Sequence, residues 1–171
     1  MHITDILPKE GWAELEREIH QRFGLSAHAY DTQGATFTGA HNWGNALCPA
    51  LRQSPTAAST ICSVVNQVMR AEVAGGQPAL TECDAGMLVT CAPVVVDGEM
   101  LGMVGACGGF LGPEACAESF LIEKTSGLTE DAVEELSKSV KRFTEEQAQA
   151  VTDYIAGRVA EIINTYKARK A

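Results

Sequence analysis

The sequence contains no apolar run of the ~20 residues that a membrane-spanning helix needs. Its first 23 residues alternate charged and apolar positions without a basic start, unlike a signal peptide or a membrane anchor. Basic residues are also scarce, with 13 lysines and arginines against 22 acidic residues and a net charge of -9. Phosphate backbones attract basic surfaces, so we expect a cytoplasmic protein that binds neither membrane nor nucleic acid.

The chain has no internal repeat, low-complexity tract or long linker. Its 171 residues are 46% hydrophobic and 20% charged, which is ordinary for a globular protein and enough to build a core. We therefore expect one domain over residues 1–171, with a helical C-terminal region at about 113–168.

Three parts of the chain carry helix patterns. Apolar residues recur every three or four positions over residues 10–23, which predicts an amphipathic helix. Ser54-Pro55 supplies an N-cap and a first-turn proline for a helix that extends to Ala74. After two shorter helices beyond residue 113, Thr144 and Gln147 form a capping-box pattern that opens a long final helix with an apolar stripe.

Strand-like segments lie between turn residues at 26–30, 35–39, 79–82, 88–96 and 100–109. The first two are expected to form a hairpin, and Asp97-Gly98 predicts a tight turn between the last two. The order of elements predicts an α+β fold with a central antiparallel sheet of about five strands, covered by helices as in PAS and GAF sensors. A pocket between sheet and helices would suit a small ligand.

Six cysteines are many for this length: Cys48, Cys62, Cys83, Cys91, Cys107 and Cys116. A reducing compartment disfavours structural disulfides, and no C-x-x-C pair marks a zinc module. Each cysteine alone is most simply a small buried hydrophobe. A group of them could instead ligate a metal.

Several cysteines stand in distinctive surroundings. Leu47-Cys48 and Ile61-Cys62-Ser63 precede Cys83-Asp84-Ala85-Gly86-Met87, and Pro93-Val94, Gly98-Glu99 and Gly102 follow. This succession resembles the PocR sensory domain, and the resemblance extends to the closing helices through Gly127-Leu128-Thr129 and Phe143-Thr144. It implies a PAS-related module that senses small organic compounds and is usually joined to a DNA-binding or kinase output.

Two positions depart from the family pattern. Asp84 stands where the family usually has His, and Cys107-Gly108 stands where it often has Gly-Gln. Losing an imidazole and gaining a thiol shifts the site toward all-thiolate coordination, which suits zinc or an iron–sulfur cluster.

The hairpin indicates which thiols could meet. A two-residue turn pairs Val96 with Glu99, Cys91 with Val104 and Leu88 with Cys107. Alternation then places Cys91 and Cys107 on opposite faces, although a bulge would reverse this conclusion. We therefore predict a metal site made of Cys48, Cys62, Cys83 and Cys107, with Cys91 and Cys116 as packing residues.

For ligand contacts in general, the predicted set is Trp43, Cys48, Cys62, Cys83, Asp84, Met87, Cys107 and Phe110. Further candidates are the apolar side chains of Tyr30, Phe37, Met69 and Met103, with Asn45 as a polar contact. Aromatic and methionine residues are commonly plain core, and this remains the simpler reading for each of them.

The leading functional hypothesis is a sensor that binds a small ligand or a cysteine-ligated metal centre. It would pass the signal through its terminal helices to a protein partner or a second copy. The alternative is a redox protein that carries an iron–sulfur cluster or zinc. A cysteine-dependent enzyme would need Cys83 beside a base such as His28 or His41, and because nothing in the sequence brings them together, we expect no enzyme.

Overall fold

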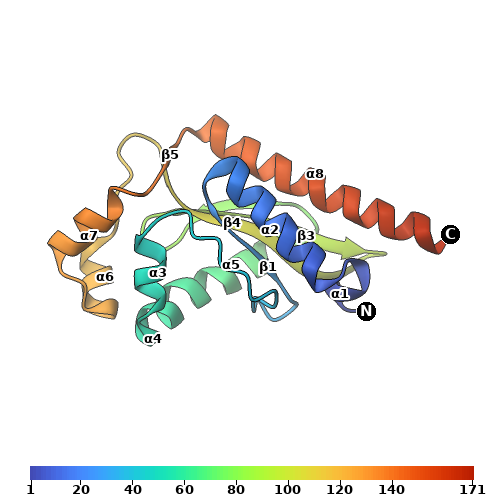
Figure 1. Cartoon of the computed structure of the whole chain (residues 1–171), viewed down its shortest axis with the longest axis horizontal. Coiled ribbons are helices and arrows are strands. Elements are labelled where there is room, and N and C mark those ends of the chain that lie inside the picture. The colour runs from blue at the N-terminus through green and yellow to red at the C-terminus, as the bar shows by residue number, and fades with distance from the viewer.

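The computed structural model describes all residues, 1–171, and is shown in Figure 1. The strands are β1 Ser26–Tyr30, β2 Ala79–Glu82, β3 Leu88–Val96, β4 Glu99–Leu111 and β5 Arg142–Phe143. The α-helices are α1 Ile3–Ile6, α2 Lys9–Phe23, α3 Leu47–Arg52, α4 Pro55–Ala57, α5 Val64–Glu72, α6 Ser119–Ser126, α7 Glu130–Ser137 and α8 Glu145–Lys170. The α6–α7 pair lies at one end of the molecule, and both termini lie at the other (Figure 1).

The five-stranded sheet confirms the α+β prediction. Its order is β1-β4-β3-β2 with antiparallel pairing, and the two-residue β5 lies parallel to the end of β4. The predicted strand at 35–39 is wrong, because only Thr36 forms a single bridge, to Tyr30. Residues 31–46 instead form a long loop that connects β1 to α3.

The β3–β4 hairpin has the predicted turn but not the predicted register. Asp97 and Gly98 both have positive φ (52° and 84°), as a type I′ turn requires, and Val96 pairs with Glu99. An irregularity between Val94 and Val95 shifts the pairing so that Cys91 faces Gly105 and Val89 faces Cys107, and a second one between Leu88 and Val89 pairs Leu88 with Gly109. Because residues 89 and 91 share a face, Cys91 and Cys107 lie on the same side of the sheet, and the prediction of opposite sides is wrong.

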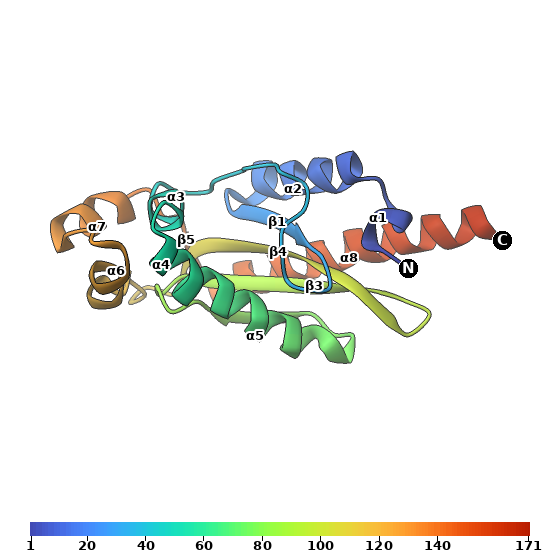
Figure 2. The same cartoon turned by 90° about the horizontal axis from the view of Figure 1, so that it is seen from below.

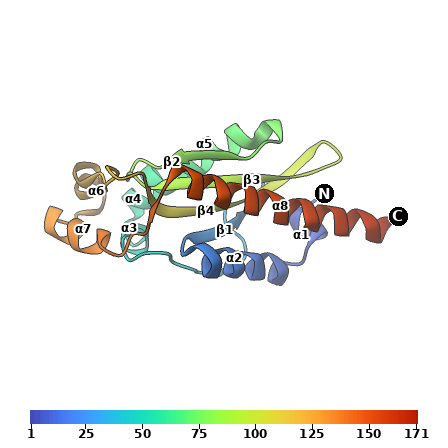
Figure 3. The ribbon, with the colours of Figure 1, turned by 90° about the horizontal axis from the view of Figure 1, so that it is seen from above.

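Helices cover both faces of the sheet. The views from below and above place α5 on one face and α8 on the other (Figures 2 and 3). The main core joins α1, α2 and α8 to alternate residues of β1, β3 and β4, whereas a smaller cluster joins α5 to Tyr30, Val89 and Met103. The apolar stripe of α8 is therefore buried against the sheet through Val151, Ile155 and Val159.

Two helices begin at the N-caps that the sequence predicts. Ser54 Oγ accepts a hydrogen bond from the Ala57 amide, and Thr144 exchanges capping-box bonds with Gln147. The expected central helix contains a π-helical segment, η1 Ala58–Ser63, before α5 and ends in a 3₁₀ turn, η2 Val73–Gly75. None of the helices has both the length and the apolar character required to cross a bilayer.

Candidate ligand-binding pocket

A cavity lies between the sheet and the α3–α5 segment. Its volume is about 40 Å³. A buried water molecule needs at least ~10–15 Å³ on this scale, so there is room for a few waters or a ligand of a few non-hydrogen atoms. The walls are formed by His28, Tyr30, Trp43, Cys48, Leu51, Arg52, Ile61, Cys62, Val65, Asn66, Cys83, Ala85, Met87, Val89, Cys107 and Gly108.

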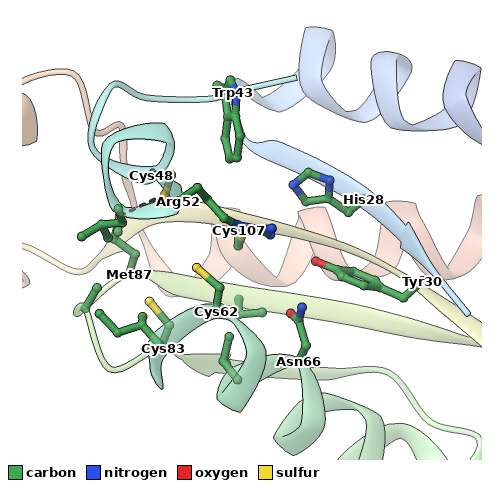
Figure 4. A pocket seen from close by; sticks show the side chains of 16 residues that line it. His28, Tyr30, Trp43, Cys48, Arg52, Cys62, Asn66, Cys83, Met87 and Cys107 are labelled. Atoms are coloured by element: carbon green, nitrogen blue, oxygen red, sulfur yellow. Dashed lines mark hydrogen bonds between the residues drawn. The ribbon is translucent and has the colours of Figure 1, made fainter. Parts of the chain in front are cut away.

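The structure brings most of the predicted site residues to this cavity. The wall includes Trp43, Cys48, Cys62, Cys83, Met87 and Cys107 (Figure 4). Two predicted residues do not line the cavity: Asp84 is exposed, and Phe110 is buried in the cluster that includes the wall residue Met87, with Arg142 over its ring. The thiols therefore converge on one space from four separate parts of the chain.

Local structure positions each thiol. Cys48 lies in the first turn of α3, and the π-helical segment carries Cys62; such segments often occur at functional sites. Cys83 follows β2, where its amide bonds to the Met87 carbonyl and its own carbonyl to the Gly86 amide. Cys107 is on β4, facing the same side as Val89.

Gly108 lets β4 approach α3 closely. Its φ is +92°, and a Cβ there would stand 2.6 Å from Asn45 Nδ2 and 3.3 Å from Cys48 Sγ. Asn45 uses this space to donate a 2.8 Å hydrogen bond to the Gly108 carbonyl, and its Oδ1 accepts one of 2.7 Å from the Cys48 amide. The glycine next to Cys107 thus permits the contact that holds Cys48 in the wall.

Burial keeps three of the wall thiols, those of Cys48, Cys83 and Cys107, protonated at neutral pH. It raises the pKa of Cys48 to about 12, raises that of Cys83, and raises that of Cys107 well above the ordinary thiol value. The bond from Asn45 and the positive charge of Arg52 only partly offset this effect on the pKa of Cys48. In this state the thiols act as soft, apolar wall groups.

In this conformation, no group of three or more His, Cys, Asp or Glu side chains is arranged to hold a metal ion. The four wall cysteines share the cavity, but as separate thiols. Cys91 is buried beside Met69 and Met103, outside the cavity wall. Cys116 is exposed, so its prediction as a packing residue is wrong.

The polar groups of the wall were only partly predicted: Tyr30 was named as an apolar contact and His28 as a possible base, whereas Arg52 and Asn66 were missed. His28 is only 4% exposed, and its Nε2 has no hydrogen-bond partner within the protein. Burial, followed by the charge of Arg52, lowers the pKa of His28 to about 4, so the ring is neutral at physiological pH. The hydroxyl of Tyr30, a largely buried residue, points into the same space, and Asn66 also lines the cavity (Figure 4).

Two spacings in the sequence could have identified these groups. His28 and Tyr30 are two residues apart on β1 and therefore share a face of that strand. Arg52 follows Cys48 by four residues on α3, which places both on one side of the helix. Both spacings indicate a site only once it is known which face of β1 and which side of α3 line the cavity. The sequence alone does not show this.

A largely apolar cavity with a few convergent polar groups, enclosed by a sheet and its covering helices, is typical of small-molecule sites. The family model described as "Sensory domain found in PocR" matches residues 5–166. This match covers nearly the whole chain, which therefore belongs to the PocR sensory-domain family. Searches of curated proteins and of solved structures found no match.

Proposed function

We propose that this chain is a signal-sensing domain that binds a small ligand in the cavity between α3–α5 and the sheet. The observation that carries the proposal is the unpartnered Nε2 of His28, buried in a cavity wall. A buried nitrogen without a hydrogen bond costs about 1–3 kcal/mol, and a bound ligand could recover that energy. Membership of a sensory family supports the same function.

In the proposed mechanism, the bound state is passed to a protein partner or a second copy through the terminal helices. The cavity and α8 contact opposite faces of β3 and β4, so the sheet would carry the signal. Thr90 of β3 links directly to α8 through a hydroxyl–hydroxyl hydrogen bond of 2.6 Å with Thr152. A small shift of β3 would therefore change the packing of α8.

The test is isothermal calorimetry with a panel of two- to four-carbon compounds: an alcohol, an aldehyde, a ketone, an amide and a carboxylate. At least one class should bind one-to-one to the wild-type protein. Cys62→Phe, which places a ring in the cavity, should abolish this binding, whereas Cys116→Phe, at an exposed position, should retain it. Absence of binding by every class, or equal binding by Cys62→Phe, would contradict the proposal.

A second candidate, a cysteine-ligated iron–sulfur or zinc centre, is supported by the convergence of Cys48, Cys62, Cys83 and Cys107 on one cavity. The thiols would have to lose their protons and move together, because none of them is yet arranged as a ligand set. Anaerobic purification with iron, sulfide and zinc analysis tests it. A centre retained in Cys91→Ala but lost in Cys83→Ala would support this candidate, and a metal-free wild type would overturn it.

A further inference from the structure

Arg52 is the one basic side chain in the cavity wall, and no Asp or Glu accompanies it there. Its side chain extends from the end of α3 toward the space between His28 and Cys107 (Figure 4). None of the protein's ion pairs includes Arg52, and its guanidinium lies 5.9 Å from the ring centre of Trp43. Most of the 13 lysines and arginines lie outside ion pairs, so Arg52 is distinguished by its place in the cavity wall and not by the lack of a partner.

The thiols do not neutralise this charge. Burial keeps the pKa of Cys48 and Cys107 far above neutral, even with the guanidinium nearby. His28 is neutral for the same reason, since burial and Arg52 both lower its pKa. The cavity therefore has one uncompensated positive charge, and neutral hydrogen-bonding groups surround it.

From this arrangement, we propose that the ligand is a small carboxylate, held by Arg52 and hydrogen-bonded by His28 and Tyr30. The inference rests on the ligand-sensing function proposed above and specifies the chemical class of the ligand. A guanidinium presents a planar pair of N–H donors that matches the two oxygens of a carboxylate. His28 and Tyr30 supply ring and hydroxyl donors to the same space: His28 Nε2 has no partner within the protein, and the Tyr30 hydroxyl points into the cavity.

The remainder of the cavity fits a short apolar chain. Leu51, Ile61 and Met87 line it together with the cysteine side chains, and the volume of about 40 Å³ leaves room for only a few carbon atoms. An inorganic phosphate would place two negative charges opposite a single cation and leave the apolar wall without a partner. A short-chain carboxylate would pair its charge with Arg52 and place its carbon chain against the apolar wall. Because Arg52 is exposed at the mouth of the cavity, it can also attract the anion from solvent.

The test compares propionate with propionamide and propan-1-ol by calorimetry at fixed ionic strength. These compounds share a three-carbon skeleton, and only propionate carries a charge. We expect propionate to bind at least tenfold more tightly than either neutral compound. Arg52→Gln should lose this preference, whereas Arg17→Gln, which removes the same charge from an exposed position on α2, should keep it.

The outcomes separate this inference from the proposed function. If a neutral compound binds in the cavity as tightly as propionate, or if Arg52→Gln binds propionate like the wild type, the carboxylate inference fails and the sensing function stands. Tighter Arg52-dependent binding of inorganic phosphate would also overturn the carboxylate assignment. If no compound of any class binds, the proposed function itself fails.

Discussion

At the scale of single residues, His28 determines much of the behaviour of the cavity. The ring is almost fully buried, and its pKa is lowered to about 4 from a model-peptide value of 6.5. The unfolded chain therefore binds a proton at a higher pH than the folded chain does. The stability that depends on a neutral His28 is fully present above pH 6.5 and is lost as the pH falls toward 4.

We predict that the free energy of unfolding falls by on the order of 3 kcal/mol through this group between pH 6.5 and pH 4. His28→Phe should flatten the dependence in that range because the variant has no titrating ring. Urea unfolding at a series of pH values measures the effect, with His41→Phe as a control at an exposed position. If the free energy of unfolding has the same pH dependence in His28→Phe and in the wild type, protonation of His28 does not cause the loss of stability.

Residue patterns predicted part of the cavity and missed the rest. Cys48, Cys62, Cys83 and Met87 lie in the segments that resemble the family, whereas Cys107 was selected as a departure from the family pattern and Trp43 as an apolar candidate. The structure places all six in the wall. Arg52 was missed because its spacing from Cys48 has meaning only once it is known which side of α3 faces the sheet. His28 was considered only as a catalytic base, since its burial depends on long-range contacts such as that with Trp43 of the 31–46 loop.

At the scale of elements, a buried carboxylate joins α2 to β1 and to the loop that follows it. Glu16 is fully buried; it accepts hydrogen bonds of 2.7 Å from the Ala29 amide and 2.8 Å from Thr38 Oγ1. Burial raises the pKa of Glu16, and these two bonds partly offset the rise. The contact holds the loop that carries Trp43 to the cavity wall.

Glu16→Ala should lower the free energy of unfolding by about 2–3 kcal/mol, because two buried donors lose their acceptor. The variant should also weaken ligand binding, since the loop bearing Trp43 loses its attachment. Chemical denaturation measures the first effect. Glu14→Ala, an exposed substitution on the same helix, should change stability by no more than about 0.5 kcal/mol. Equal stability of the two variants would contradict the role assigned to Glu16.

Local signals predicted most elements, and long-range pairing was the main source of error. The caps at Ser54 and Thr144 and the turn at Asp97-Gly98 depend on neighbouring residues, and all three were confirmed. The hairpin register was wrong because two irregularities in β3–β4 leave no mark in the alternation of residues. The fifth strand was misplaced at 35–39 for a related reason: β5 has only two residues and depends on contact with β4.

At the scale of the whole molecule, α5, which helps to enclose the cavity, and α8 lie on opposite sides of one sheet (Figures 2 and 3). The apolar stripe of α8, which suggested a free partner surface, is already occupied by β3 and β4. A signal that reaches this helix must therefore change its packing on the sheet. In the proposed mechanism, occupancy of the cavity therefore changes the packing of α8.

Hydrogen–deuterium exchange of Cys62→Phe, compared with Cys116→Phe, tests this claim most directly, because the ring in the cavity imitates permanent occupancy. Thermal unfolding first establishes that both variants are folded. We expect amide exchange in Cys62→Phe to be slower than in the wild type over α3–α5 and also over α8. Cys116→Phe should exchange like the wild type. Slower exchange at α3–α5 with α8 unchanged would contradict transmission through the sheet, and no change in either region would contradict the cavity as the sensing site.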